Sequence, residues 1–131
     1  MINEKAYEEL SRNYRFFASW RHFAFAGGVT ILAGVVKIAA DYEICSPPFT
    51  LAAIGGVLAE VALLVIDARA RNLTGLAVER GAELERPYVG FFGAAKVDGS
   101  WPRHTWAAWS FYVASSLVMI GSVIYCLKCS N

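Results

Sequence analysis

The sequence is short of charge. Lysine and arginine together number 12 and aspartate and glutamate 11, so charged residues make up 18% of the chain and the net charge is +1 at pH 7. Hydrophobic residues make up 56% of it. This composition excludes a disordered chain, and the near-zero net charge gives no reason to expect nucleic acid as a partner. Because 131 residues cannot hide so much apolar surface from water, insertion into a lipid bilayer is favoured.

Motifs of catalysis are missing as well. The sequence has no phosphate-binding glycine loop, no His-Glu-x-x-His zinc motif and no nucleophile elbow. Its two histidines, His22 and His104, are far apart in the sequence. We therefore expect no enzymatic activity, no cofactor and no metal site.

Three apolar segments reach, or nearly reach, the length that spans a bilayer: residues 22–41, 47–66 and 105–127. Apart from their ends they contain only two charged residues, Lys37 in the first and Glu60 in the second. Crossing about 30 Å of hydrocarbon takes about 20 residues of apolar helix. One such run would also suit a buried core helix, but three leave too little sequence to cover them. The sequence predicts an all-α integral membrane protein with three transmembrane helices.

Basic residues are concentrated on one side of these predicted spans. The region before the first span and the region between the second and third hold ten of the 12 lysines and arginines. The positive-inside rule therefore predicts a multi-pass protein of the bacterial inner membrane, with the N-terminus in the cytoplasm and the C-terminus outside.

The cytoplasmic regions next to the first two spans have helical patterns. Residues 3–21 and 67–86 contain no proline, and we expect the two segments to pack as an antiparallel helical stalk. The stalk is interpreted as a simple hairpin, as an oligomer core, or as the docking surface for a cytoplasmic protein partner. Its apolar faces repeat at helical spacings and consist of Tyr7, Leu10, Tyr14 and Phe17 in the first segment and Leu73 and Leu84 in the second.

Residues 87–104 interrupt this helical pattern. They contain two prolines and three glycines but keep four aromatic side chains. We expect an elbow at the level of the lipid headgroups, where tyrosine and tryptophan are favoured. A re-entrant pore loop is the alternative.

Glu60 is the acidic residue placed deepest in a predicted span. It lies 13 residues after Pro47, slightly to the cytoplasmic side of the bilayer centre, and Tyr112, Ser115 and Ser116 of the third span lie at a similar depth. Two interpretations remain open. Glu60 is either a proton or cation site in an oligomeric pore, or a protonated acid that bonds a neighbouring hydroxyl and holds helices together.

Two further groups of residues are candidates for structural bonds. Arg21, His22, Asp67 and Arg71 belong to one predicted membrane boundary, so we expect an ion-pair cluster there, with a gate as the alternative. Three cysteines, Cys45, Cys126 and Cys129, belong to the predicted outer side, where disulfides persist. A disulfide from Cys45 to either of the others is the leading expectation; free thiols and a redox or metal pair are the alternatives.

Several short stretches of the first two-thirds of the chain form a pattern. They are Tyr14-Arg15-Phe16-Phe17, Trp20-Arg21-His22-Phe23, Ile66-Asp67-Ala68-Arg69, Leu73, Ala77 and Leu84-Glu85. In these stretches the chain resembles a loosely defined group of small bacterial inner-membrane proteins whose second span continues into a cytoplasmic helix with an Asp-x-Arg and Leu-Glu pattern. The resemblance implies a ring-forming membrane protein or a membrane effector of an anti-phage system, without transferring a functional residue.

Small residues at helical spacings predict close helix contacts within one chain or between chains. The leading hypothesis is a homo-oligomeric pore or membrane-disrupting effector in a defence or stress system. The alternative is a non-conducting anchor whose stalk binds a soluble partner. The small-residue patterns are Ala24 with Gly28, Ala52 with Gly56, and Ala108 with Ser115 and Ser122.

Overall fold

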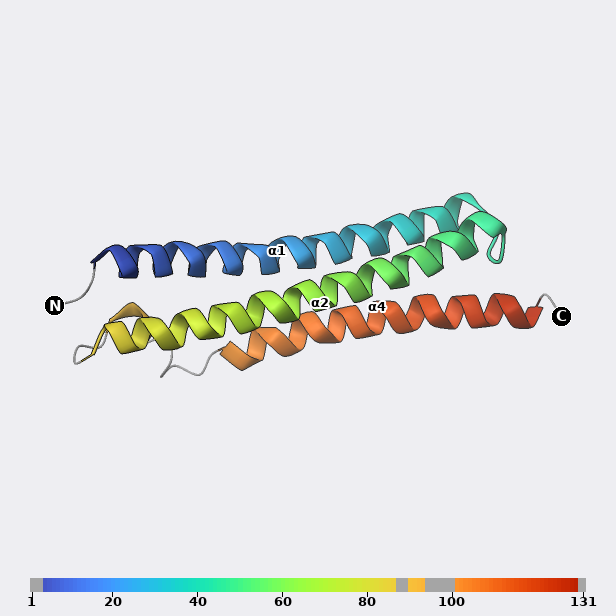
Figure 1. Cartoon of the computed structure of the whole chain (residues 1–131). Coiled ribbons are helices and arrows are strands. Elements are labelled where there is room, and N and C mark those ends of the chain that lie inside the picture. Colours follow the sequence, from blue (N-terminus) through green and yellow to red (C-terminus); the bar gives the residue numbers. More distant parts are fainter. Residues whose placement is uncertain (1–3, 87–89, 94–100, 130–131) are drawn as a thin grey trace. The chain divides into compact units, whose positions relative to one another are not determined.

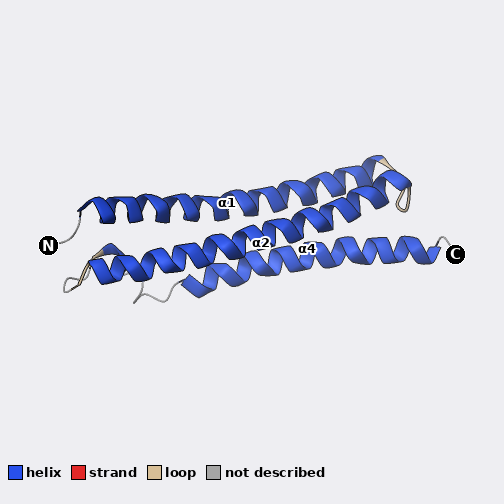
Figure 2. Ribbon diagram, in the orientation of Figure 1, coloured by secondary structure: helices blue, strands red, loops and turns tan. Residues whose placement is uncertain are grey.

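The computed structural model describes residues 4–86, 90–93 and 101–129. It consists of three long helices, α1 (Glu4–Asp41), α2 (Pro47–Leu84) and α4 (Trp101–Cys129) (Figure 1). The described part of the chain contains no strand (Figure 2). All three helices are long and apolar enough to cross a membrane. The predicted all-α fold is therefore confirmed, and the three helices indicate a multi-pass membrane protein.

Two of the three helices begin with a proline in their first turn, and two include a predicted stalk segment. The predicted stalk segments continue into the spans without a break, since α1 and α2 each have 38 residues. Pro47 stands in the first turn of α2, where its missing N–H is not needed. Pro102 has the same place in α4, which begins at Trp101. The helix thus begins four residues before the span predicted from residue 105, because a proline in a first turn does not prevent a helix.

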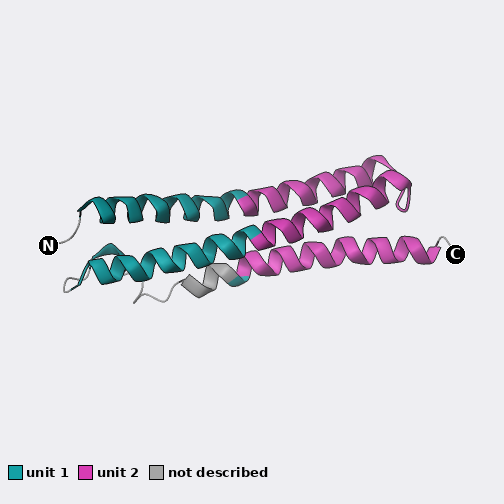
Figure 3. Cartoon of the chain, in the orientation of Figure 1, with its two compact units in different colours: residues 1–23, 66–106 teal, residues 24–65, 107–131 magenta. Residues whose placement is uncertain are grey.

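The chain divides into two compact units (Figure 3). Unit 1 comprises residues 1–23 and 66–106, and unit 2 comprises residues 24–65 and 107–131. The division falls close to the predicted boundary between stalk and membrane spans. Each unit has its own buried residues and its own polar contacts, and the two are described separately below.

Unit 1 contains the first part of α1 and the second part of α2. The stripe on α1 formed by Tyr7, Leu10, Tyr14 and Phe17 is half-buried, whereas Arg12 between them is exposed. The facing side of α2 is built mainly from small residues, so the two helices approach closely. Its buried residues are Ala70, Thr74, Ala77, Val78 and Gly81, and Leu73 and Leu84 are half-buried.

Unit 2 brings all three long helices together over small residues. A Cβ atom on Gly28 would lie 2.9 Å from the ring of Tyr112, and one on Gly56 would lie 2.6 Å from the sulfur of Met119. Gly28 and Gly56 thus allow α1, α2 and α4 to pack within one chain, as the small-residue patterns predicted without deciding between contacts within and between chains.

Unit 2 differs from a water-soluble bundle in that its surface is apolar and its interior includes polar side chains. Glu60 and Ser115 are buried, while Leu58 and Leu117 are 68% and 63% exposed. In water such an arrangement would expose apolar surface and bury polar groups, both at a cost. In hydrocarbon it is the favourable one, because exposed leucine meets lipid and polar groups find partners inside.

Candidate functional site

The candidate site in unit 2 is the carboxyl of Glu60. Its side chain has no exposed surface, and the hydroxyl of Ser115 donates a hydrogen bond to its Oε2 atom. The same Ser115 oxygen lies 2.9 Å from the carbonyl oxygen of Phe111 in its own helix. A hydroxyl has one hydrogen, so it can serve only one acceptor at a time. The pair therefore has a second arrangement, in which Ser115 donates to Phe111 and a protonated Glu60 donates to Ser115.

The remaining predicted residues of this site differ in their placement. The other carboxyl oxygen, Oε1 of Glu60, is buried and has no hydrogen-bond partner among the described residues. Tyr112 is buried one turn before Ser115 and packs its ring over Gly28, whereas Ser116 is only half-buried. Glu60 is enclosed by helices of its own chain.

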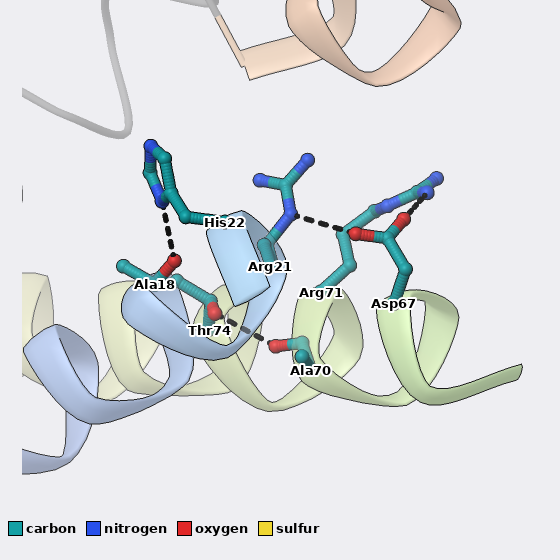
Figure 4. Close-up of polar contacts among 7 residues, drawn as sticks. All are labelled: Ala18, Arg21, His22, Asp67, Ala70, Arg71 and Thr74. Atoms are coloured by element: carbon teal, nitrogen blue, oxygen red, sulfur yellow. Dashed lines mark hydrogen bonds and ion pairs between the residues drawn. The ribbon is translucent and has the colours of Figure 1, made fainter. Parts of the chain in front are cut away.

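At the predicted membrane boundary, unit 1 contains a buried ion-pair cluster (Figure 4). The carboxylate of Asp67 is 2% exposed; its Oδ1 atom lies 3.4 Å from Nε of Arg21, and its Oδ2 atom lies 2.9 Å from Nη2 of Arg71. His22 is exposed, and its Nδ1 atom lies 3.0 Å from the carbonyl oxygen of Ala18 in its own helix. The expectation that His22 joins this cluster was wrong, because neighbours on a helix point about 100° apart and Arg21 occupies the side facing α2.

Glu85, one residue after α2, was not among the predicted site residues. Its carboxylate is buried and accepts hydrogen bonds from the Tyr7 hydroxyl at 2.9 Å and from the backbone N–H groups of Phe92 at 3.1 Å and Gly93 at 2.7 Å. A Cβ atom on Gly90 would collide with this carboxyl. Glu85 therefore holds residues 90–93 on the helical pair, in the way that an acidic side chain caps a helix N-terminus.

Phe92 completes this contact. It is fully buried, packs edge-on against Tyr7 and Tyr14 with ring centroids 5.6 and 5.7 Å apart, and occupies the space left by the missing side chain of Gly81. Tyr7 and Tyr14 precede Phe23 by roughly 14 to 24 Å along α1. Of the segment 87–104 predicted as an interfacial elbow, residues 90–93 pack against Tyr7 and Tyr14 of the stalk. Residues 87–89 and 94–100 of this segment lie outside the described part.

The contacts of Glu85 shift two pKa values in opposite directions. Burial raises the pKa of Glu85, but the backbone N–H groups of Gly93, Phe92 and Gly90 and the Tyr7 hydroxyl outweigh burial and hold the pKa below its ordinary value of 4.5. The hydrogen bond to Glu85, followed by burial and the nearby negative charge, raises the pKa of Tyr7 above 10.0. The stability that Glu85 contributes is therefore present above pH 4.5 and is lost as the pH falls through the lowered pKa of Glu85. The stability that Tyr7 contributes is present below pH 10.0 and is lost as the pH rises through the raised pKa of Tyr7.

We expect Glu85→Gln to remove this acid sensitivity and to lower the stability of unit 1 near neutral pH by about 1 to 3 kcal/mol, since an amide is a weaker acceptor for backbone N–H groups. Protease resistance of the α1–α2 pair, measured from about pH 3 to about pH 8, tests this. Glu83→Gln is the matched control, because Glu83 is exposed. An acid transition that persists unchanged in Glu85→Gln would contradict the assignment.

The three cysteines are also placed by the structure. Of the pairings left open by the sequence, Cys45 is bonded to Cys126, with their Cα atoms 4.9 Å apart. Cys129 is free and exposed. Among the described residues, no group of histidine, cysteine and acidic side chains is arranged to hold a metal ion.

Comparisons with known proteins do not assign the chain to a family: no family model, no curated protein and no solved structure matches it. The fold and the distribution of polar residues define a multi-span helical membrane protein. Any finer function has to be argued from the geometry of the two units.

Proposed function

We propose that the chain is a homo-oligomeric pore or membrane-disrupting effector of the bacterial inner membrane, in which Glu60 controls ion passage. The observation that supports this proposal is a carboxyl in the apolar part of α2 with no exposed surface and one oxygen without a hydrogen-bond partner among the described residues. A purely structural polar contact would favour full satisfaction of both oxygens. Ionisable groups inside membranes serve ion or proton movement more often than other buried polar groups do.

The location of Glu60 changes how such a pore would work. Because Glu60 is covered by helices of its own chain, ions reach it only when those helices shift, or when a proton moves along the pair formed with Ser115. The two hydrogen-bond arrangements of this pair differ by one proton on Glu60. Several copies are still required, since three helices enclose little polar lining by themselves.

The test is ion flux from dye-loaded liposomes that contain the purified protein, with the oligomer mass checked in the same preparation. We expect Glu60→Gln, which keeps the size of the side chain but cannot ionise, to change the flux several-fold or more while the oligomer persists. Ser115→Ala should shift flux in the same direction. Ser122→Ala is the matched control, because Ser122 lies seven residues further along α4 and its hydroxyl donates a hydrogen bond to the Val118 carbonyl of that helix, 2.9 Å away.

Unchanged flux in a correctly assembled Glu60→Gln variant would remove Glu60 from the mechanism. Absence of flux from an assembled wild-type oligomer would favour the second candidate, a membrane anchor. One observation supports that candidate: unit 1 exposes Phe16, Leu76 and Phe91, each more than half exposed, on the surface of the stalk. The predicted docking stripe is different, since Tyr14 packs against Phe91 and Phe92 within the unit.

A further inference from the structure

The three cysteines of the chain all belong to unit 2, and together they offer more than one covalent arrangement. Cys45 stands in the short connection between α1 and α2 and is bonded to Cys126 of α4. Cys129, three residues after Cys126 on the same helix, has an exposed thiol. A nucleophilic thiol thus lies one helical turn from a disulfide.

Helix geometry places the Cα atom of Cys129 about as far from that of Cys126 as the Cα atom of Cys45, the present disulfide partner. Residues three apart on an α-helix have Cα atoms about 5 Å apart, inside the window of about 4.4 to 6.8 Å that disulfides occupy. The Cα atoms of Cys45 and Cys126 are 4.9 Å apart.

We propose that the three cysteines form a disulfide-exchange site, in which Cys129 displaces Cys45 from Cys126. The Cys129 thiol gives its proton to water, and its thiolate attacks Sγ of Cys126. The bond between Cys126 and Cys129 forms while the bond between Cys45 and Cys126 breaks, and Cys45 leaves as a thiolate that takes a proton from water. One disulfide and one thiol are present before and after, so the step needs no oxidant or reductant.

The exchange changes what Cys45 and its loop can do. In the bonded form Cys45 has a φ of 76°, a backbone region that residues other than glycine rarely adopt. After exchange the connection between α1 and α2 is no longer tied to α4, and the Cys45 thiol becomes a site for covalent capture of an external disulfide. The class of ligand for this site is therefore a thiol-reactive disulfide, which exchanges one of its own thiols for Cys45.

The test maps the cysteine pairing of the full-length protein in lipid vesicles. Samples without reductant are held at several pH values, labelled with a limiting amount of N-ethylmaleimide and digested, and the peptides are identified by mass spectrometry. We expect a peptide with an internal bridge between Cys126 and Cys129, together with labelled Cys45, and both should form faster at higher pH because the thiolate is the nucleophile. Labelling of Cys45 should fall at least tenfold in Cys129→Ser.

The Cys129→Ser variant removes an exposed thiol that forms no disulfide but shares a side-chain hydrogen bond with Tyr125. Serine keeps a hydroxyl for this contact, and an unchanged thermal midpoint checks that the variant folds. Equal labelling of Cys45 in the wild type and in Cys129→Ser would overturn the proposal, since the free Cys45 would then come from incomplete oxidation. Complete absence of the bridge between Cys126 and Cys129 at every pH, over hours, would overturn it too, because uncatalysed exchange takes minutes to hours.

Discussion

Replacing Phe92 by alanine is expected to lower the free energy of unfolding of unit 1 by about 3 to 5 kcal/mol. The ring is fully buried between Tyr7 and Tyr14 and above Gly81, so its removal leaves a cavity that the rigid helices cannot close. The change should appear as faster proteolysis of the α1–α2 pair and as greater hydrogen exchange at residues 4–21 and 67–84.

The neighbouring residue is the matched control for this experiment. Phe91 is 59% exposed, so Phe91→Ala should cost less than about 1 kcal/mol. The two variants remove the same side chain from adjacent positions of one segment, which leaves burial as the main difference between them. Equal effects of the two substitutions would show that residues 90–93 do not pack on the stalk.

Gly56→Leu is expected to disrupt the packing of unit 2, with a cost of about 1 to 3 kcal/mol or more. A Cβ atom at this position would lie 2.6 Å from the sulfur of Met119 and 3.1 Å from Cγ2 of Val35, so both of these side chains would have to move to admit leucine. The measurement is the thermal midpoint of the purified protein in one detergent, together with its oligomer mass.

Gly55→Leu provides the comparison, because a Cβ atom on Gly55 meets no other atom within 4 Å. Both substitutions replace glycine by leucine in the same turn of α2, so the gain in helix propensity, about 0.8 kcal/mol, is shared and cancels in the difference. We expect Gly55→Leu to be neutral or slightly stabilising. A loss of stability as large as that of Gly56→Leu would mean that close contact at Gly56 does not hold unit 2 together.

Periodic and local features of the chain could be predicted from the sequence. The three apolar runs determine the helices, because few other arrangements satisfy the backbone of such segments. The stripe from Tyr7 to Phe17 was found from its spacing, and Gly28 and Gly56 were found as small residues at helix contacts. The pair formed by Asp67 and Arg71 followed from their separation by four residues on one helix.

Contacts between distant segments could not be predicted in the same way. Whether Glu60 meets Ser115 or Ser116 depends on how α4 is rotated, and a rotation by one residue, about 100°, exchanges the two. The packing of Phe92 on the stalk depends on Gly81 and Glu85. In the sequence, Gly81 is only a residue of low helix propensity and Glu85 is only a charge near a helix end. A signal was present in the run from Glu85 to Gly93, where an acidic residue is followed by a proline and two glycines.

The bond between Cys45 and Cys126 also determines the covalent topology of the protein. The two residues are 81 positions apart, so the bond closes most of the chain into a ring, and only residues 1–44 and 127–131 extend from it. A protease cut at any single position inside the ring opens it without releasing a fragment. Such a nicked protein keeps its full mass until this bond is reduced or exchanged, and then separates into two pieces whose sizes locate the cut.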